Sequence, residues 1–361
     1  MGGRALVVLG GQGTALTLNM PDASQDTAQD IDAVVLWVDG DDPIHRQKLD
    51  KHLASIGRRP ISARPTRFRS VGEVGYCIRS ILKFAPFVRR IHVVTDAQVP
   101  AIFATASAWP KALRNKLALV DHRQIFAGHE DCLPTFNSLA IESLLHRVPG
   151  LAEQFVYFND DMMLIRPVAP AALFCEGRPV LHGRYVSMPE LRLAWRLRAL
   201  WRKVSRPEPG SLRASNTLAQ ALGARMAGAR GRFLLAGHNP YPLRRSTIDR
   251  YFAAHPQALQ RNLGYPLRDA AQFAPTALAH HLELQIGHAI VEPDDCCLYL
   301  KPASKGRTAT RIAAAAVDAR KTFACVQSLD EADDAVQRQV VAWIDQLVRF
   351  DAAAEPDGAQ P

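Results

Sequence analysis

Two adjacent aspartates, Asp160 and Asp161, follow the apolar run "QFVYF" (154–158) and stand with Asn159 at the end of a predicted strand. Neighbouring carboxylates repel each other and resist burial, so this placement needs either a counter-charge or a turn. A divalent ion supplies the counter-charge, and oxygen ligands favour Mg²⁺ or Mn²⁺. Magnesium usually takes one or two protein carboxylates and completes its shell with water and phosphate oxygens. The pair therefore indicates a metal–phosphate site or a turn, in which Asn and Asp are common.

Two further segments carry residue types suited to the same chemistry. The turn "LWVDGDDP" (36–43) supplies Asp39 at a second strand end, with Trp37 able to stack or pack beside it. The segment "GHNPY" (237–241) presents His238 next to a proline-fixed turn and ahead of two arginines. A loop histidine with basic neighbours suits a general base near phosphate. The alternatives are an ordinary acidic turn and a structural histidine.

The elements that must position these residues alternate along the chain. Apolar patterning predicts strands at 31–38, 89–96, 116–122 and 154–164, and helices at 72–84 and 137–148. This alternation indicates an α/β fold with a mostly parallel sheet, in which ligands bind beyond the carboxyl ends of the strands. Polar side chains follow all four predicted strands, and we expect them to form one site: Asp39, Asp41 and Asp42; Thr95 and Asp96; Asp121 and His122; Asn159, Asp160 and Asp161.

The domain organisation follows from changes in composition. We predict an extension at 1–30, an α/β core at 31–183, a basic helical insertion at 184–232, the C-terminal part of the same domain at 233–350, and a disordered tail at 351–361. The insertion holds eleven Arg or Lys residues against two Glu and no Asp, and its segment 190–204 predicts a helix with one basic face. That face is interpreted as the solvated side of a packed helix, as a surface for anionic lipids, or as a groove for an anionic acceptor.

Composition limits the classes of partner. The net charge of +9 favours polyanions such as nucleotides, acidic lipids or phosphorylated polymers. We do not expect nucleic acid, because acidic strand ends would face its phosphate backbone and no nucleic-acid-binding module is recognised. The six cysteines form no C-x-x-C pair, which indicates reduced thiols in a cytoplasmic protein. No apolar run has the length of a membrane span.

Several blocks together resemble the Stealth family, which comprises bacterial capsular polysaccharide phosphotransferases and the animal N-acetylglucosamine-1-phosphotransferase. "IDAVVLWVDGDDP" (31–43) resembles the opening block of that family. The second block runs over residues 67–164 and ends in "LPTFNSLAIESLLHRVPGLAEQFVYFNDDMML". "GHNPYPLRRS", continuing to "YPLRDAAQFA" (265–274), resembles the third block, and "KTFACVQSLDEAD" (321–333) resembles the fourth. The resemblance covers about residues 31–335.

The resemblance implies a Rossmann-like, glycosyltransferase-A-like core that binds a nucleotide sugar and a metal ion. It also implies a reaction in which a hydroxyl of a growing capsular or exopolysaccharide attacks the β-phosphorus of a UDP-sugar. The sugar-1-phosphate is transferred as a phosphodiester, and UMP leaves. The expected partners are a UDP-sugar donor and an oligosaccharide or polysaccharide acceptor. The expected location is cytoplasmic, with peripheral contact to the inner membrane or to a capsule assembly complex.

The resemblance also implies roles for individual residues. Asp160 and Asp161 would hold Mg²⁺ or Mn²⁺, His238 would be the general base, and Arg268 would grip phosphate. Asp161 is thereby counted with His238 and Arg268 as catalytic. Five residues are expected to bind substrate: Trp37, Asp39, Arg79, Asn137 and Ser138. A helix-surface ion pair is the alternative for Arg79.

Three positions depart from the family pattern. Gly75 stands where the family has an arginine, Leu36 where a threonine is usual, and Pro266 where an R-F-R motif has its first basic residue. These departures leave the identity of the donor sugar open. Two rival functions also stay open: a metal-dependent glycosyltransferase, which would release UDP, and a non-catalytic protein that binds anionic glycans.

Overall fold

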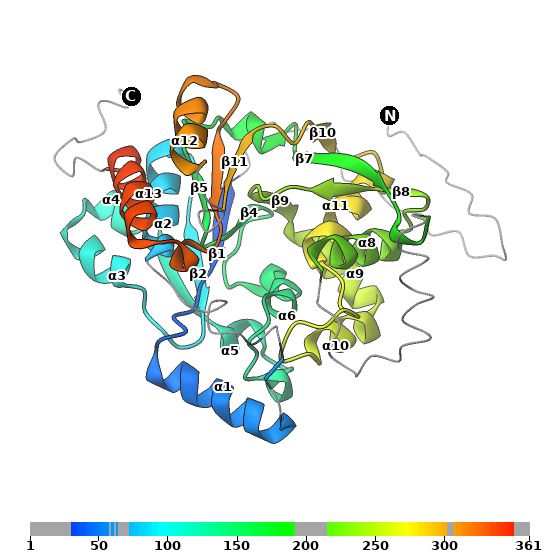
Figure 1. Ribbon diagram of the computed structural model, residues 1–361. Helices are drawn as coiled ribbons and strands as arrows, with labels where there is room; N and C mark the ends of the chain where they lie inside the picture. The colour runs from blue at the N-terminus through cyan, green and yellow to red at the C-terminus, as the bar shows by residue number, and fades with distance from the viewer. Residues whose placement is uncertain are drawn as a thin grey trace.

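The computed structural model describes residues 30–57, 59–60, 63, 72–191, 215–301 and 307–349. Within these residues the strands form three sheets, and helices surround them (Figure 1). The helices are α1 (Pro43–Ile56), α2 (Glu73–Phe84), α3 (Ala101–Thr105), α4 (Lys111–Arg114), α5 (His122–Ile125), α6 (Ser138–Glu142), α8 (Asn216–Met226), α9 (Arg245–Ala254), α10 (Pro256–Leu263), α11 (Pro275–Gln285), α12 (Thr308–Val317) and α13 (Asp334–Leu347).

The main sheet has five strands in the order β3-β2-β1-β4-β9. These are β1 (Ile31–Leu36), β2 (Ile91–Thr95), β3 (Leu117–Asp121), β4 (Gln154–Asn159) and β9 (Tyr241–Arg244). All neighbours pair in parallel except β4 and β9, which are antiparallel. The predicted α/β fold with a mostly parallel sheet is therefore confirmed. The chain moves outward from β1 to β3 and returns to β4 on the other side of β1, so the order reverses between β1 and β4, where such sheets bind ligands.

The strands of this sheet are apolar because both of their faces are covered. All six residues of β1 are buried, including Asp32. The Asp32 carboxylate accepts hydrogen bonds from Arg89 Nε and Nη2 at 2.9 and 2.7 Å, and from the backbone N–H of Ala152 at 2.9 Å. These donors hold the pKa of Asp32 well below its usual range although burial opposes ionisation. The buried charge thus connects β1 to the segments that precede β2 and β4.

A second sheet lies beyond β9. It contains β6 (Phe174–Cys175), β7 (Arg178–Ser187), β8 (Arg232–Ala236) and β10 (Ile290–Glu292), in the order β10-β7-β6 with β8 paired to β7. Its strands β8 and β10 and the end of β7 lie outside the α/β core predicted at 31–183. Helices α8 and α11 pack against each other on this side of the molecule (Figure 1). β7 runs through the predicted boundary at residue 183 and pairs with β8 across the predicted insertion. The predicted helix at 190–204 lies outside the described residues from position 192 onward.

The third sheet has three strands in the order β11-β12-β5: β5 (Met162–Leu164), β11 (Cys297–Leu300) and β12 (Phe323–Val326). The sequence predicted one strand over 154–164, but β4 ends at Asn159 and β5 belongs to this other sheet. Asp160 and Asp161 form the turn between the two sheets. The acidic pair therefore marks a change of direction in the chain as well as a strand end.

The predicted helix at 137–148 is also divided. α6 ends at Glu142, and a 3₁₀ turn follows at Leu145–Arg147. The N–H of Leu144 bonds to the carbonyl of Ile141 at 2.9 Å, three residues back, which tightens the last turn and stops the α-helix. No helix within the described ranges is long and apolar enough to cross a membrane.

Candidate active site

The acidic pair lies at the carboxyl end of β4, beside the end of β1. Leu36 pairs with Asn159, so the residues after each strand leave the sheet next to each other. Burial raises the pKa of Asp160 well above its usual range, and the charges of Asp161 and Glu73 add to this effect. Burial also raises the pKa of Asp161 to about 6. Three carboxylates thus lie within electrostatic reach of one another, a strong reason for a cation to bind.

The Asp161 carboxylate is held on one side and unsatisfied on the other. Its Oδ2 lies 3.5 Å from the Cys325 thiol of β12, and its backbone oxygen accepts from Val326 N–H at 2.9 Å. Its Oδ1 is buried and accepts no hydrogen bond from the described residues. Those same residues contain no group of three His, Cys, Asp or Glu side chains arranged to hold a metal. Two neighbouring carboxyl groups with an unsatisfied oxygen fit an ion such as Mg²⁺, which takes few protein ligands and draws the rest from water and phosphate.

His238 reaches the same place through β9. Because β9 runs antiparallel to β4 and Tyr241 pairs with Tyr157, the residues just before Tyr241 lie beside those just after Tyr157. The His238 ring stacks on Tyr299, with ring centroids 4.6 Å apart and an angle of 20° between the planes. Burial lowers the pKa of His238, so its imidazole is neutral at neutral pH and can accept a proton.

Arg268 joins the site through a series of hydrogen bonds. Its Nη2 donates to Ser138 Oγ at 2.5 Å, and Ser138 Oγ donates to Glu142 Oε1 at 3.1 Å. The Tyr157 hydroxyl lies 3.3 Å from the same Glu142 oxygen and 2.6 Å from Asn159 Oδ1. Burial raises the pKa of Glu142 to about 7, although the Arg268 charge opposes this. A buried carboxyl that titrates near neutrality thus connects the cation to the end of β4.

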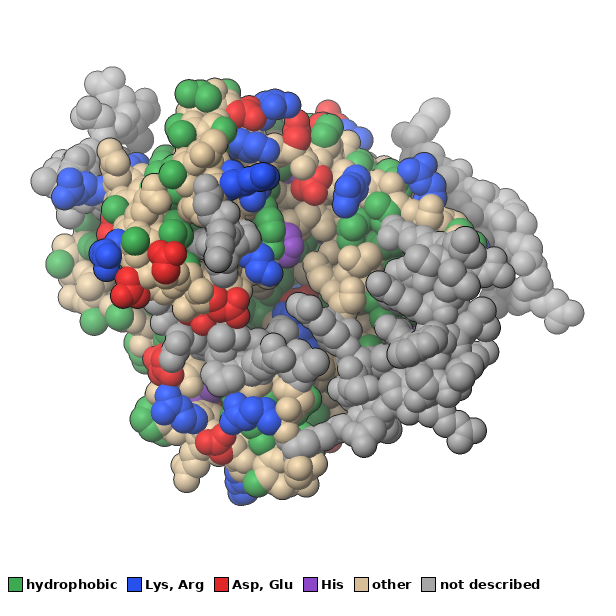
Figure 2. Space-filling model, viewed as in Figure 1, with side chains coloured by type: hydrophobic (Ala, Val, Ile, Leu, Met, Phe, Trp, Pro, Cys, Tyr) green, Lys and Arg blue, Asp and Glu red, His purple; other side chains and the backbone are tan. Residues whose placement is uncertain are grey.

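The surface is hollowed near the centre of the face in Figure 2, where acidic, basic and histidine side chains lie together. Asp160, Asp161, His238 and Arg268 are all partly exposed, whereas the residues that hold them, Cys325 and Glu142, are buried. The described residues therefore offer two carboxyl groups, an imidazole and a guanidinium to solvent, and keep the supporting groups below.

Two protein-family models match the chain. Residues 29–56 match the model of Stealth protein conserved region 1, and residues 67–180 match the model of Stealth protein conserved region 2. The chain carries conserved regions 1 and 2 of Stealth proteins. The resemblance of 237–274 and 321–333 to the third and fourth blocks stays a prediction.

Curated relatives of this Stealth protein are named as polysaccharide phosphotransferases. An exopolysaccharide phosphotransferase of Streptomyces coelicolor is 46% identical over 151 residues, which cover 42% of this chain and 26% of that protein. A second from the same organism is 31% identical over 276 residues, covering 75% of this chain and 27% of that protein. The capsular polysaccharide phosphotransferase WcwK of Streptococcus pneumoniae is 42% identical over 147 residues, covering 40% and 42%. The chain thus spans less than half the length of these relatives.

Solved structures align with this Stealth protein only loosely. The galactosyltransferase LgtC in complex with donor and acceptor sugar analogs gives a TM-score of 0.40 at 10% identity, covering 90% of this chain and 98% of that one. Mouse xyloside xylosyltransferase 1 gives 0.34 at 10% identity, covering 82% and 97%. Both TM-scores are below 0.5, so the α/β fold follows from the strand order of the main sheet and not from these alignments.

Two of the predicted substrate-binding residues lie at the β1 end of the site. Trp37 follows β1 and packs, partly exposed, against the core. Asp39 is fixed through its backbone, because the Gln98 side chain accepts from its N–H at 2.8 Å and donates to its carbonyl at 2.9 Å. The Asp39 carboxylate accepts only from the N–H of Asp41 among the described residues. Both side chains are therefore placed where a donor could reach them.

The structure places two other predicted residues elsewhere in this Stealth protein. Arg79 donates to Gly75 O at 3.3 Å and approaches Asp345 of α13 at 3.9 Å, the alternative expected from the sequence. Asn137 is fully buried, and its amide donates to Tyr265 O and Gln272 Oε1, each at 2.8 Å. A side chain without exposed surface cannot contact a substrate, so Asn137 anchors the loop that carries Arg268 instead.

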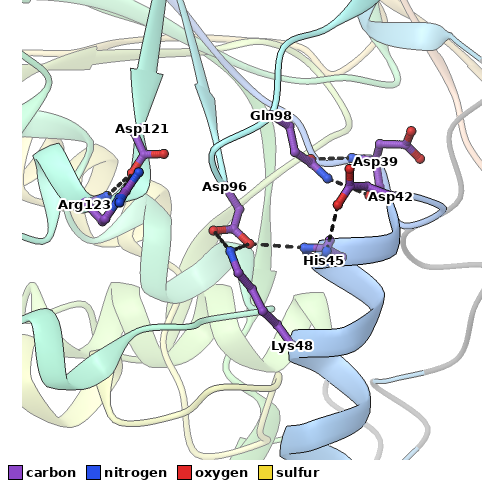
Figure 3. A network of polar contacts seen from close by, with 8 residues as sticks. All are labelled: Asp39, Asp42, His45, Lys48, Asp96, Gln98, Asp121 and Arg123. Carbon is purple, nitrogen blue, oxygen red and sulfur yellow. Dashed lines mark hydrogen bonds and ion pairs between the residues drawn. The ribbon is translucent and has the colours of Figure 1, made fainter.

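Two of the four polar strand ends are held by ion pairs with neighbouring residues, and that all four form one site stays a prediction. Asp96, after β2, lies 2.8 Å from Lys48 Nζ and 3.4 Å from His45 Nδ1, both on α1 (Figure 3). Asp121, after β3, bonds instead to Arg123 and begins α5 (Figure 3). Although burial opposes ionisation, the contacts with His45 and Lys48 hold the pKa of Asp96 well below its usual range. Asp96 therefore docks α1, and the end of β1 lies next to the end of β4, where the acidic pair follows.

Sequence reasoning missed the residues that support the site. Glu142 was the clearest signal, because a glutamate stands within the apolar run "LAIESLL" four residues after Ser138, on the same helix face. Cys325 and Tyr299 gave no such signal, because a cysteine and a tyrosine in short apolar strands are ordinary core residues. Their contacts depend on a strand pairing that the sequence pattern does not specify.

Proposed function

We propose that this Stealth protein transfers a sugar-1-phosphate from a UDP-sugar to a hydroxyl of a growing capsular or exopolysaccharide, forming a phosphodiester and releasing UMP. The observation that carries the proposal is the turn after β4, where two neighbouring carboxyl groups lie, one of them within electrostatic reach of Arg268, and where the antiparallel pairing of β9 directs the His238 segment. Its support also includes the family and the names of the relatives. The activity is expected in the cytoplasm, with the acceptor delivered at the inner face of the membrane.

Each residue has a role that its surroundings support. Neutral His238 would accept the proton of the attacking hydroxyl, as a base with a lowered pKa can do at neutral pH. Arg268 uses one N–H on Ser138, and its other N–H groups bond to no described residue, so they can bind phosphate oxygens. Trp37 and Asp39 would contact the nucleotide part of the donor. Phosphoryl transfer needs little more from a protein than such positioning and charge stabilisation.

Asp160 and Asp161 would hold a Mg²⁺ or Mn²⁺ ion. The bound ion would neutralise charge on the two phosphates of the donor, as divalent cations do in other phosphoryl transfers. The unsatisfied Asp161 Oδ1 and the repulsion within the acidic pair support this assignment. Asn159, held by Tyr157, would fix the turn that presents both carboxylates.

The experiment is to identify the nucleotide that the enzyme releases. The purified chain is incubated with a panel of UDP-sugars, Mg²⁺ or Mn²⁺ and short capsule-type acceptors, and UMP and UDP are separated by ion exchange. We expect UMP release that depends on the acceptor, is abolished by EDTA and by Asp161→Asn, and is lowered about 10²- to 10⁴-fold by His238→Ala. Asp50→Asn, at an exposed carboxylate on α1 that pairs with Arg59, is the matched control and should leave the rate unchanged.

The other outcomes contradict the proposal in different ways. Acceptor-dependent release of UDP would identify a glycosyltransferase, because the bond broken would then be the glycosidic one. Donor binding without release of either nucleotide, unaffected by Asp160→Asn and Asp161→Asn, would identify a binding protein. Either result would overturn sugar-1-phosphate transfer.

A further inference from the structure

The third sheet connects the two halves of the site. Across it, Tyr299 of β11 pairs with Cys325 of β12, and Cys325 pairs with Met162 of β5, directly after the acidic pair. Directly paired residues project from the same face of a sheet. Tyr299 therefore lies beside the thiol that contacts Asp161, and the Asp161 charge acts on the pKa of the Tyr299 hydroxyl. A short sheet thus carries contacts to the acidic pair on one strand and to His238 on the next.

The contacts to His238 come from several residues of the β11 segment. The Cys297 thiol donates to the backbone oxygen of His238 at 3.1 Å, and the Tyr299 ring stacks on the imidazole at 4.6 Å. The Tyr299 hydroxyl donates to Gln327 Oε1, so the tyrosine ring is fixed at its far end. Next to His238, the Asn239 amide donates to Asp294 Oδ1 at 2.9 Å. The backbone of the histidine is therefore held by strand neighbours, and its ring orientation is held by Tyr299.

We propose that Tyr299 is a positioning residue for His238. This inference rests on the proposed function, in which His238 is the general base. A histidine side chain has two rotatable bonds, and a ring nitrogen accepts a proton efficiently only when it faces the reacting hydroxyl at hydrogen-bond distance. Stacking against a fixed ring removes the freedom of the imidazole to turn away. Tyr299 thereby sets the direction of the base relative to the acidic pair without touching the substrate.

The kinetic test compares Tyr299→Phe, which keeps the stacked ring, with Tyr299→Leu, which removes it. For acceptor-dependent UMP release we expect Tyr299→Leu to lower kcat by about tenfold to a hundredfold, as loss of orientation does, with the donor KM within about twofold. Tyr299→Phe should stay within about threefold of wild type. On a His238→Ala background, Tyr299→Leu should cause no further loss, because it acts through the missing ring.

The chain offers a matched control at a second stacked pair. Tyr251 and His255 on α9 stack with centroids 4.4 Å apart and an angle of 16°, almost the same geometry. Tyr251→Leu should leave kcat and KM unchanged. Equal losses in Tyr299→Phe and Tyr299→Leu, or losses that multiply in the double variant with His238→Ala, would overturn the positioning role.

A second measurement does not depend on activity. In protein labelled with ¹⁵N-histidine, the ring protons of His238, assigned from their absence in His238→Ala, should move downfield in Tyr299→Leu as the ring-current shift is lost. They should keep their position in Tyr299→Phe and in Tyr251→Leu. Unchanged His238 signals in Tyr299→Leu would refute the stack whatever the enzyme releases. If the His238 ring protons move downfield in Tyr299→Leu as expected but wild type releases no UMP, the proposed function is refuted and the stacking of Tyr299 on His238 stands.

Discussion

Glu142 gives a sharp test of how the buried part of the site is charged. Its pKa is about 7 in the folded protein against 4.5 for a solvated glutamate, because burial disfavours the carboxylate. The contribution of Glu142 to the free energy of unfolding is therefore fully present below pH 4.5 and is lost as the pH rises to 7. Each pKa unit is worth about 1.4 kcal/mol, so ionisation of Glu142 costs the fold at most about 3–4 kcal/mol. The substitution Glu142→Gln removes the charge and keeps an oxygen for Ser138 and Tyr157.

The expected result is a pH-dependent gain in stability. In urea unfolding with EDTA present, Glu142→Gln should match wild type near pH 4.5 and exceed it by about 2–3 kcal/mol at pH 8. The same variant should lose UMP release by about tenfold or more, because the series of hydrogen bonds that holds Arg268 through Ser138 then ends on a neutral group. Glu176→Gln, at a glutamate whose side chain is 78% exposed, is the control and should show no such gain. A difference that is constant with pH, or a variant less stable at pH 8, would refute the reasoning.

Three further predictions concern the metal ion, α1 and acid. Mg²⁺ with UMP should raise the melting temperature of wild type by about 2–4 °C in a thermal shift assay, and Asp161→Asn should abolish the rise; an equal rise in the variant would contradict metal binding by the pair. Lys48→Met should cost about 2 kcal/mol in urea unfolding, because it leaves Asp96 half-buried without its cation, and the double variant with Asp96→Asn should recover part of the loss. Burial lowers the pKa of His122 to about 4, so wild type should lose up to about 3 kcal/mol as the pH falls from 6.5 to 4, and His122→Gln should flatten that profile in acid unfolding.

The central sheet could be predicted because its signals are local. Apolar runs such as "IDAVVL" and "QFVYFN" need cover on both faces, and the helices between them supply it. The positions of the acidic pair after β4 and of His238 before β9 could be predicted for the same reason, since each follows or precedes a strand of the main sheet. The class of fold and the placement of these residues at strand ends are thus encoded in short segments, and their roles stay a prediction.

The rest of the site depends on contacts between distant segments. Arg268 and Ser138 are 130 residues apart, and Asn137 holds their loops together from inside the core. No pattern within either segment predicts that contact. Asp96 shows a second case, because nothing near this polar strand end predicts that α1 brings Lys48 to it. Packing between elements decides such cases, and local periodicity does not report it.

The pairing of β5 with β12 also has a consequence for synthesis on the ribosome. Cys325 follows Asp161 by 164 residues, which at about 5–20 residues per second take roughly 8–33 s to translate. Once residue 180 has been made, the nascent chain contains both Stealth regions and the acidic pair. Until β11 and β12 follow, β5 has no partner from β12, and the Tyr299 ring that stacks on His238 is missing. A fragment that stops before β11 would therefore carry the family's sequence signature without an assembled site.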